Sequence, residues 1–384
     1  AAAARADAER KAGRTRGPLH GIPYGAKDLL AARGARTTWG AMPFKDQVID
    51  HDAAVIQRLD EAGAVLVAKL SLGALAWGDV WFDATTKNPW NTEQGSSGSS
   101  AGPASAVAAG LLPFAIGSET YGSIVSPCTR CGATGLRPTF GRVSRVGAMT
   151  LSWTMDKLGP IARAVEDCSL VLEAIAGADG VDPTAVDLPH RHPGTETLAG
   201  VRVGFVEAEM QGESALDMQV LEDLRAMGLE LVPVAWPEAP AAADLMTVLS
   251  VEAATAFDAL TRSGRDDLMV RQERFAWPNA FRSAQMIPAV EYVRAMRLRT
   301  LLMEGVAKVF ERVDVVVSPS FAAALPITHL TRLPRAVAPC GFDGDGDPAS
   351  ITFIGGLYRE ESLVAVAGAW QRATRHNEKR PKEF

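Results

Sequence analysis

The chain has 384 residues, of which 47% are hydrophobic and 22% are charged, and this balance is typical of a soluble globular protein with a large core. Its net charge of −6 and its pI near 5.6 give no electrostatic reason to expect nucleic acid as a partner. Since no apolar run approaches the length of a transmembrane helix, we also expect no membrane partner.

The first residues of the sequence read as part of a longer helix. The sequence begins with Ala instead of Met, and residues 1–12 read as the end of a charged, Ala-rich helix. We therefore expect that an N-terminal segment is missing, and the sequence leaves open whether a signal peptide once preceded it. We expect the protein to be cytoplasmic.

The next part of the chain predicts a helix over 53–62 and a buried strand over 64–69. The stretch 72–82 then contains Trp77 and Trp81, which would face the same way on a helix. Two interpretations of these tryptophans stay open, because they would either pack in the core or line an apolar pocket.

The stretch 95–127, GSSGSSAGPASAVAAGLLPFAIGSETYGSIVSP, is the centre around which the rest of the chain is organised. Two Ser/Gly turns flank a small-residue helix predicted over 104–111 and an apolar strand predicted over 112–116. Such turns bring exposed backbone N–H groups and hydroxyls to one place. A nucleophile beside preorganised hydrogen-bond donors is the arrangement that acyl transfer needs.

The four cysteines include the close pair Cys128 and Cys131. No second Cys pair or His pair sits at metal-ligand spacing, so we expect buried structural thiols and neither a metal nor a cofactor. The six histidines show no HExxH motif, and no His-based triad is indicated.

The C-terminal half predicts a further α/β repeat. Strands over 201–206 and 229–234 are separated by a helix over 215–227, which suggests parallel pairing. Residues 241–311 read as mostly helical, with an arginine-rich face (Arg294, Arg297 and Arg299) that we interpret as a solvated helix surface in preference to a ligand site. Three more strands are predicted after it: 313–318, 336–342 and 349–356.

Three short motifs resemble the amidase signature family of serine hydrolases: GIPYGAKD at 21–28, GSSAG at 98–102 and ETYGSIVSP at 119–127. Members of this family use a Ser–cis-Ser–Lys triad and need no metal or cofactor. The resemblance implies that Ser123 is the acyl-accepting nucleophile and that Lys27 is the base.

The bridging serine has two look-alike sites, Gly95–Ser96–Ser97 and Gly98–Ser99–Ser100. The second matches the family better because AVAAG follows it at the usual offset, so the resemblance implies Ser99, joined to Gly98 by a cis peptide. The oxyanion hole maps onto four consecutive backbone N–H groups: Thr120, Tyr121, Gly122 and Ser123.

The residue types suit this chemistry. A serine hydroxyl is a poor nucleophile and needs an adjacent base, and a lysine amine serves when burial holds it neutral. We expect neutral Lys27 to take a proton from Ser99 while Ser99 takes one from Ser123, which attacks the carbonyl carbon.

The nucleophile turn departs from the family's usual DTGGSIR-x-P. Glu119 replaces Asp, Tyr121 replaces the first Gly, and Val125 replaces Arg. Losing Asp and Arg together suggests a coordinated change of packing. Tyr121 either occupies a backbone conformation that favours Gly or places an aromatic ring on the pocket wall. The candidates for substrate binding are Trp77, Ser100 and Tyr121.

The resemblance covers nearly the whole chain. It implies an α/β amidase signature fold, with a central mixed, mostly parallel β-sheet flanked by α-helices on both faces. Because the sequence has no internal repeat and no linker, we expect one domain over 1–384. The signature core would span about 17–175, and a variable helical cap about 240–312.

Three functions are weighed. The first is a hydrolase of amides, anilides or carbamates (C–N bonds other than peptide bonds), closest to the aryl-acylamidase and urethanase-like branch, acting on a small molecule as a monomer or a homodimer. The second is the glutamine-hydrolysing component of a tRNA-dependent amidotransferase, its A subunit, which is disfavoured because Val125 stands where the family carries Arg. The third is a non-catalytic phosphate binder using 95–102, which lacks the G-x-x-x-x-G-K-(S/T) loop.

Overall fold

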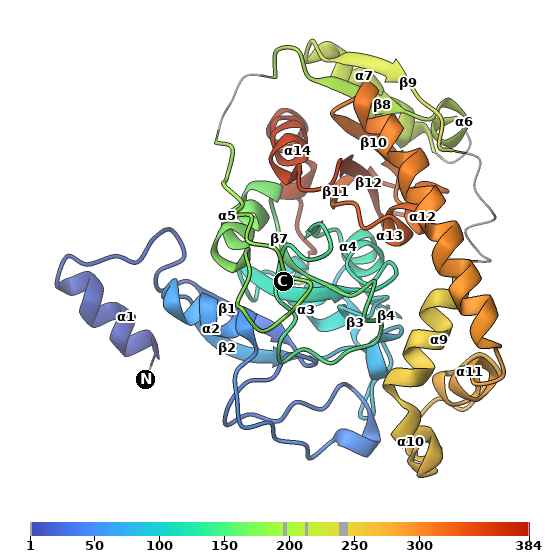
Figure 1. Cartoon of the computed structure of the whole chain (residues 1–384). Helices are drawn as coiled ribbons and strands as arrows, with labels where there is room; N and C mark the ends of the chain where they lie inside the picture. The colour runs from blue at the N-terminus through green and yellow to red at the C-terminus, as the bar shows by residue number, and fades with distance from the viewer. Residues whose placement is uncertain (1, 195–197, 212–213, 238–244, 383) are drawn as a thin grey trace.

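The computed structural model of the chain describes residues 2–194, 198–211, 214–237, 245–382 and 384 (Figure 1). Within them, ten strands form one mixed sheet in the order β2-β1-β5-β7-β6-β11-β12-β10-β8-β9. The five central pairings are antiparallel, and the pairings at the two ends of the sheet are parallel. The bounds of these strands are β1 Pro23–Lys27, β2 Val65–Leu70, β5 Phe114–Glu119, β6 Thr134–Arg137, β7 Lys157–Ala162, β8 Arg202–Phe205, β9 Glu230–Pro233, β10 Val315–Pro319, β11 Arg335–Phe342 and β12 Pro348–Gly355.

Helices cover both faces of this sheet (Figure 1). On β5, Ala115 packs in a cluster with helices α3 and α4, whereas the adjacent Ile116 packs in the cluster that contains α5 and α14. Successive side chains of a strand point to opposite faces, so these two pairs of helices lie on opposite sides. The described helices are α1 Ala2–Lys11, α2 Ala54–Glu61, α3 Ala101–Ala108, α4 Val125–Cys131, α5 Val165–Ile175, α6 Glu207–Met210, α7 Ala215–Ala226, α9 Thr247–Ala256, α10 Asp258–Arg262, α11 Trp277–Ala284, α12 Ala289–Arg312, α13 Ala324–Leu330 and α14 Glu360–Thr374.

The predicted α/β fold with a mixed sheet between helical layers is confirmed. The repeat β8–α7–β9 forms as expected, with β8 and β9 parallel. Helix α3 begins at Ala101, earlier than predicted, because Pro103 lies in the first turn, where a missing N–H group costs nothing. All four cysteines are free and buried, as expected.

Residues 72–82 do not form the helix on which Trp77 and Trp81 would face the same way. Only a short 3-10 turn, Ala74–Ala76, forms there, and Trp77 itself is extended. The backbone turns back so tightly that a Cβ on Gly73 would lie 1.9 Å from the carbonyl oxygen of Gly78. Two glycines that approach this closely favour a loop over a continuous helix.

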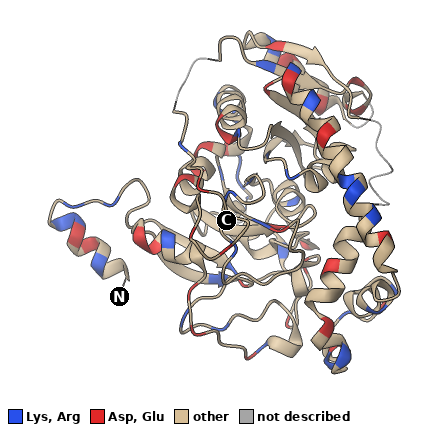
Figure 2. Ribbon diagram, in the orientation of Figure 1, with Lys and Arg blue, Asp and Glu red and all other residues tan. Residues whose placement is uncertain are grey.

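The arginine-rich face of α12 is only partly exposed. Charged residues of both signs lie along this peripheral helix (Figure 2), and most of them, Arg294 and Arg297 included, are exposed as expected. Arg299 is buried, however, and its guanidinium donates hydrogen bonds to Leu330 O at 2.6 Å and Thr154 Oγ1 at 2.6 Å. The interpretation of Arg299 as solvent-exposed is therefore wrong, because this side chain fastens α12 to the layer beneath it.

Most of the described residues in 241–311 are helical, as predicted, through α9 to α12. Residues 240–244 of the predicted cap lie outside the described residues. None of the helices in the described ranges combines the length and the hydropathy that a membrane span requires.

Candidate active site

Lys27 is the last residue of β1, and its amine lies in a nest of hydroxyl groups. Nζ is 2.8 Å from Ser99 Oγ, 3.0 Å from Ser100 Oγ and 2.9 Å from Ser118 Oγ. The side chain is fully buried, and among the described residues it makes no ion pair. Burial lowers the pKa of Lys27 well below its ordinary value, although the negative charges of Glu119 and Asp156 oppose the shift.

The structure brings Ser99 to this amine. The Gly98–Ser99 peptide is cis, and Ser99 is buried beside Lys27. Ser96, the alternative, instead donates a hydrogen bond to Ser97 O at 2.9 Å. The choice of Ser99 over Ser96 as the residue next to the base therefore agrees with the geometry.

Ser123 lies in the turn between β5 and α4. The Ser100 N–H group donates a hydrogen bond to Ser123 O at 3.0 Å, which fastens the two serine-rich turns together. Among the described residues, the Ser123 hydroxyl has no hydrogen-bond partner. The link from Ser99 to Ser123 thus stays a prediction, while the link from Lys27 to Ser99 is present.

A buried ion pair lies behind the nucleophile turn. Glu119 Oε2 accepts the N–H groups of Ile124 at 2.6 Å and Val125 at 2.8 Å, and Glu119 Oε1 accepts Arg137 Nη1 at 2.8 Å. Burial alone would raise the pKa of Glu119, but Arg137 and the two N–H groups hold it below its ordinary value. Arg137, on β6, thus pairs with Glu119 in a turn that has Val125 in place of the usual Arg.

The four predicted oxyanion donors are not equivalent. The Gly122 N–H group donates a hydrogen bond to His329 Nε2 at 3.0 Å, so it is engaged inside the protein. We therefore withdraw Gly122 as an oxyanion donor and retain Thr120, Tyr121 and Ser123. Nothing in the sequence pointed to His329, which lies far along the chain on α13.

Ser123 lines a cavity of about 590 Å³. Its walls include Trp77, Tyr121, Trp277 and Phe321, and none of the described lining residues is Asp, Glu, Lys or Arg. The indole of Trp77 packs edge-on against that of Trp277, with ring centroids 4.7 Å apart. A cavity of this size is in the range of small-molecule sites.

Two of the three predicted substrate-binding residues line this cavity. Trp77 and Tyr121 are each a little over one-third exposed at its wall, at 37% and 39%. Ser100 does not line it, because its side chain is fully buried between Lys27 and Ser118 O, which accepts its hydroxyl at 3.0 Å. We therefore withdraw Ser100 as a substrate-binding residue.

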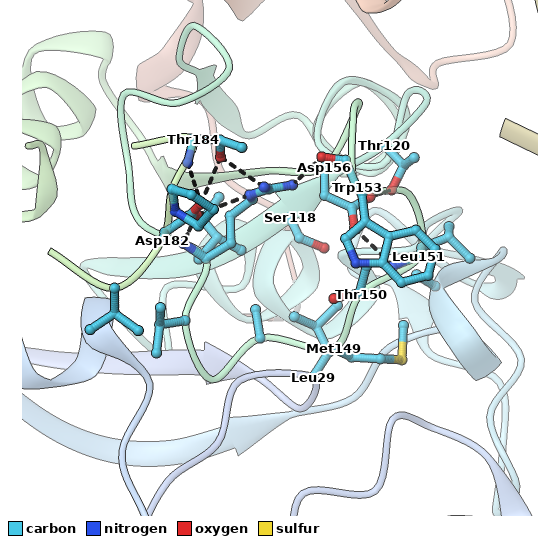
Figure 3. A pocket seen from close by; sticks show the side chains of 17 residues that line it. Leu29, Ser118, Thr120, Met149, Thr150, Leu151, Trp153, Asp156, Asp182 and Thr184 are labelled. Atoms are coloured by element: carbon cyan, nitrogen blue, oxygen red, sulfur yellow. Dashed lines mark hydrogen bonds and ion pairs between the residues drawn. The ribbon is translucent and has the colours of Figure 1, made fainter. Parts of the chain in front are cut away.

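A second cavity, of about 260 Å³, adjoins the first (Figure 3). The two share Ala76, Thr120 and Leu151 as lining residues. Figure 3 shows Asp182 and Thr184 at one end of the smaller cavity, Thr120 and Leu151 at the other, and Asp156 between them. No group of three or more His, Cys, Asp or Glu side chains in the described part of the chain is placed to hold a metal ion.

Comparison with known proteins identifies the family of this chain. The model of the family described as Amidase matches residues 1–330. The chain belongs to the amidase family. It is therefore a hydrolase of carbon–nitrogen bonds, as the motifs predicted.

Two solved amidase-family structures share the fold. The peptide amidase of Stenotrophomonas maltophilia superposes with a TM-score of 0.87 at 30% identity, covering 99% of this chain and 88% of that one. The A subunit of glutamyl-tRNA(Gln) amidotransferase from Thermotoga maritima superposes with a TM-score of 0.79 at 26% identity, covering 92% and 84%.

Among curated proteins, the A subunit of glutamyl-tRNA(Gln) amidotransferase from Roseiflexus castenholzii is 35% identical, over 98% of this chain and 87% of that protein. These relatives confirm the family without singling out the aryl-acylamidase or urethanase-like branch, which stays a prediction.

Proposed function

We propose that this amidase-family protein hydrolyses uncharged amides, anilides or carbamates whose acyl or amine part is apolar or aromatic. The observation that carries the proposal is the lining of the cavity at Ser123, which is aromatic and, among the described residues, free of ionised side chains. Burial of an ionic substrate group in such walls would cost several kcal/mol, roughly the price of an unpaired charge. An uncharged aromatic group is stabilised by packing against the same aromatic walls.

The proposed mechanism uses the buried amine as the terminal base. Neutral Lys27 takes the proton of Ser99, Ser99 takes the proton of Ser123, and Ser123 Oγ attacks the carbonyl carbon. The N–H groups of Thr120, Tyr121 and Ser123 stabilise the oxyanion, by roughly 2.7–4 kcal/mol for each donor that is lost in comparable enzymes. The relay then returns the proton to the leaving amine, and water hydrolyses the acyl-enzyme.

A second candidate is glutamine hydrolysis as the A subunit of a tRNA-dependent amidotransferase. The curated relatives favour it more than the first candidate, because they carry that name at 35% and 36% identity. In that case other subunits and a tRNA would be partners, and the expectation of no nucleic acid would be wrong. The cavity favours the first candidate, since free glutamine carries an α-carboxylate and an α-ammonium group that the described walls do not match with opposite charges.

Substrate turnover separates the two candidates. The purified chain would be given p-nitroacetanilide, an N-aryl carbamate and L-glutamine in parallel, with release of the aryl amine and of ammonia as the readouts. We expect turnover of the anilide or the carbamate and none of glutamine, with Ser123→Ala as the inactive control. Ammonia release from glutamine without turnover of either aryl substrate would overturn the first candidate and establish the second.

A further inference from the structure

We propose that His329 is a positioning residue that, together with Glu119, holds the backbone on both sides of Ser123 in its reactive arrangement. This inference rests on the proposed role of Ser123 as nucleophile. It assigns a function to a buried histidine that takes no part in the proton relay.

Two buried side chains accept hydrogen bonds from backbone N–H groups of the nucleophile turn. Before Ser123, the Gly122 N–H group donates to His329 Nε2 at 3.0 Å. After Ser123, the N–H groups of Ile124 and Val125 donate to Glu119 Oε2 at 2.6 and 2.8 Å. The backbone N–H groups of the residue before Ser123 and of the two residues after it are thus bound to two fully buried side chains.

The two holding groups also contact each other. Glu119 Oε1 lies 3.2 Å from His329 Nε2, and Arg137 Nη1 lies 2.8 Å from the same carboxylate oxygen and 3.0 Å from each ring nitrogen of His329. The ring of Tyr121 packs on His329 with centroids 5.1 Å apart. One cluster, defined here as Glu119, Arg137 and His329, therefore supports the whole turn.

His329 stays a hydrogen-bond acceptor because its imidazole is buried among cations. Burial, followed by the cations Arg137, Lys157 and Arg335, lowers the pKa of His329 well below its ordinary value. Glu119 is the anion that faces it. A neutral imidazole has one acceptor nitrogen, and the hydrogen bond from Gly122 makes Nε2 that acceptor, which leaves the proton on Nδ1.

The consequence for catalysis is geometric. A serine must be held within a fraction of an ångström of its attack position, and a misplacement of about 1 Å costs on the order of 10²-fold in rate. Without the acceptor, the Gly122 peptide is free to rotate its N–H group elsewhere, and Ser123 follows because it is the next residue. His329 touches no substrate in this scheme and acts only through the turn.

Three variants test the proposal. His329→Leu removes the acceptor at similar volume, and His329→Gln keeps an acceptor that reaches toward Gly122. His190→Leu is the matched control, because His190 is also buried, with partners Ser169 at 2.8 Å and Glu361 at 3.1 Å. The readouts are kcat and KM on a turned-over substrate, the rate of Ser123 labelling by a fluorophosphonate, and Tm.

We expect His329→Leu to lower kcat and the labelling rate by about 10²-fold while KM changes by less than about threefold. His329→Gln should recover most of the loss, and His190→Leu should keep the wild-type rates per folded molecule. Unchanged labelling in His329→Leu would overturn the proposal, as would equal losses in His329→Leu and His190→Leu. If His329→Leu does not fold, wild-type rates in His329→Gln support the acceptor role, and a folded His329→Gln that is as slow as Ser123→Ala overturns it.

Labelling also keeps this test apart from the substrate proposal. A fluorophosphonate reacts with an activated serine whatever the natural substrate is. If the aryl substrates are not turned over, the proposed substrate class is wrong, but the labelling comparison still tests the role of His329. A wild-type chain that is never labelled on Ser123 would instead sink the nucleophile assignment itself.

Discussion

The two adjoining cavities differ in how they use charge. The smaller one is lined by Arg145, Asp156 and Asp182, and these groups are matched within the protein. Arg145 Nε lies 3.2 Å from Asp182 Oδ2, and Asp156 Oδ1 accepts the Thr120 hydroxyl at 2.6 Å. The larger cavity, at Ser123, has aromatic walls and no ionised side chain among its described lining residues.

This difference in charge indicates which of the two cavities adjoins the reactive groups. The ion pair of Arg145 with Asp182 and the hydrogen bonds that Asp156 accepts fix the loops around the smaller cavity. Burial raises the apparent cost of ionising Asp182, yet hydrogen bonds from Thr184 and Arg145 outweigh it and lower the pKa of this carboxyl to about 2. We propose that reactivity instead depends on the hydroxyls and the buried amine behind the larger cavity, which is the one that Ser123 lines.

The largest expected effect is that of Lys27→Met. Without the base, kcat should fall by about 10³-fold, and the wild-type loss of activity at acid pH should disappear, because that limb reports protonation of the amine. The measurement is kcat against pH for both proteins. Matching acid limbs in wild type and Lys27→Met would rule out Lys27 as the base.

Lys27→Met should also stabilise the fold. The pKa of Lys27 in the folded chain lies well below the ordinary 10.5, so the unfolded chain binds a proton that the folded chain does not. Stability therefore rises with pH between the lowered pKa and 10.5, and it is lost as the pH falls through that window. Lys27→Met removes this penalty, so its Tm should exceed that of wild type at neutral pH, with a gain that shrinks toward alkaline pH. A lower Tm at neutral pH would contradict a neutral buried amine.

Ser99→Ala should come next. Loss of the bridging hydroxyl should lower kcat by about 10²-fold or more, because the proton path from Ser123 to Lys27 is broken. Ser96→Ala is the matched control, since Ser96 is buried nearby and its hydroxyl donates a hydrogen bond to Ser97 O. Equal losses in the two variants would show that the bridging serine is misassigned.

The smallest expected effect is a change in KM, and it should differ between two tryptophans that line different cavities. Trp77 lines the larger cavity and Trp153 the smaller one. Trp77→Ala should raise KM for an aryl substrate by about tenfold, which corresponds to about 1.4 kcal/mol of lost contact. Trp153→Ala should leave KM within about twofold of wild type. The reverse order would place the substrate in the smaller cavity.

Short contiguous motifs made the contact between Lys27 and Ser99 predictable. The residues near Lys27, Ser99 and Ser123 lie in three segments whose small and apolar neighbours already define turns and strands. Their meeting point follows from the sheet, because β1 and β5 are adjacent and parallel, so that Lys27 and the nucleophile turn lie at the same edge.

Contacts between distant segments could not be predicted from the sequence. The hydrogen bond from Gly122 to His329 joins residues that are 207 apart in the chain, and the pair of Glu119 with Arg137 depends on the order of the central strands. The burial of Arg299 had the same origin, because a helical pattern does not tell which polar face meets another layer of the protein.

The most direct test of the relay is the rate at which a fluorophosphonate labels the chain, followed over pH in wild type and Lys27→Met, with the modified peptide identified by mass. We predict an adduct on Ser123. In wild type it should form more slowly as the pH falls, whereas in Lys27→Met it should form slowly at every pH. An adduct on another residue, or identical rates and pH profiles in the two proteins, would contradict this prediction.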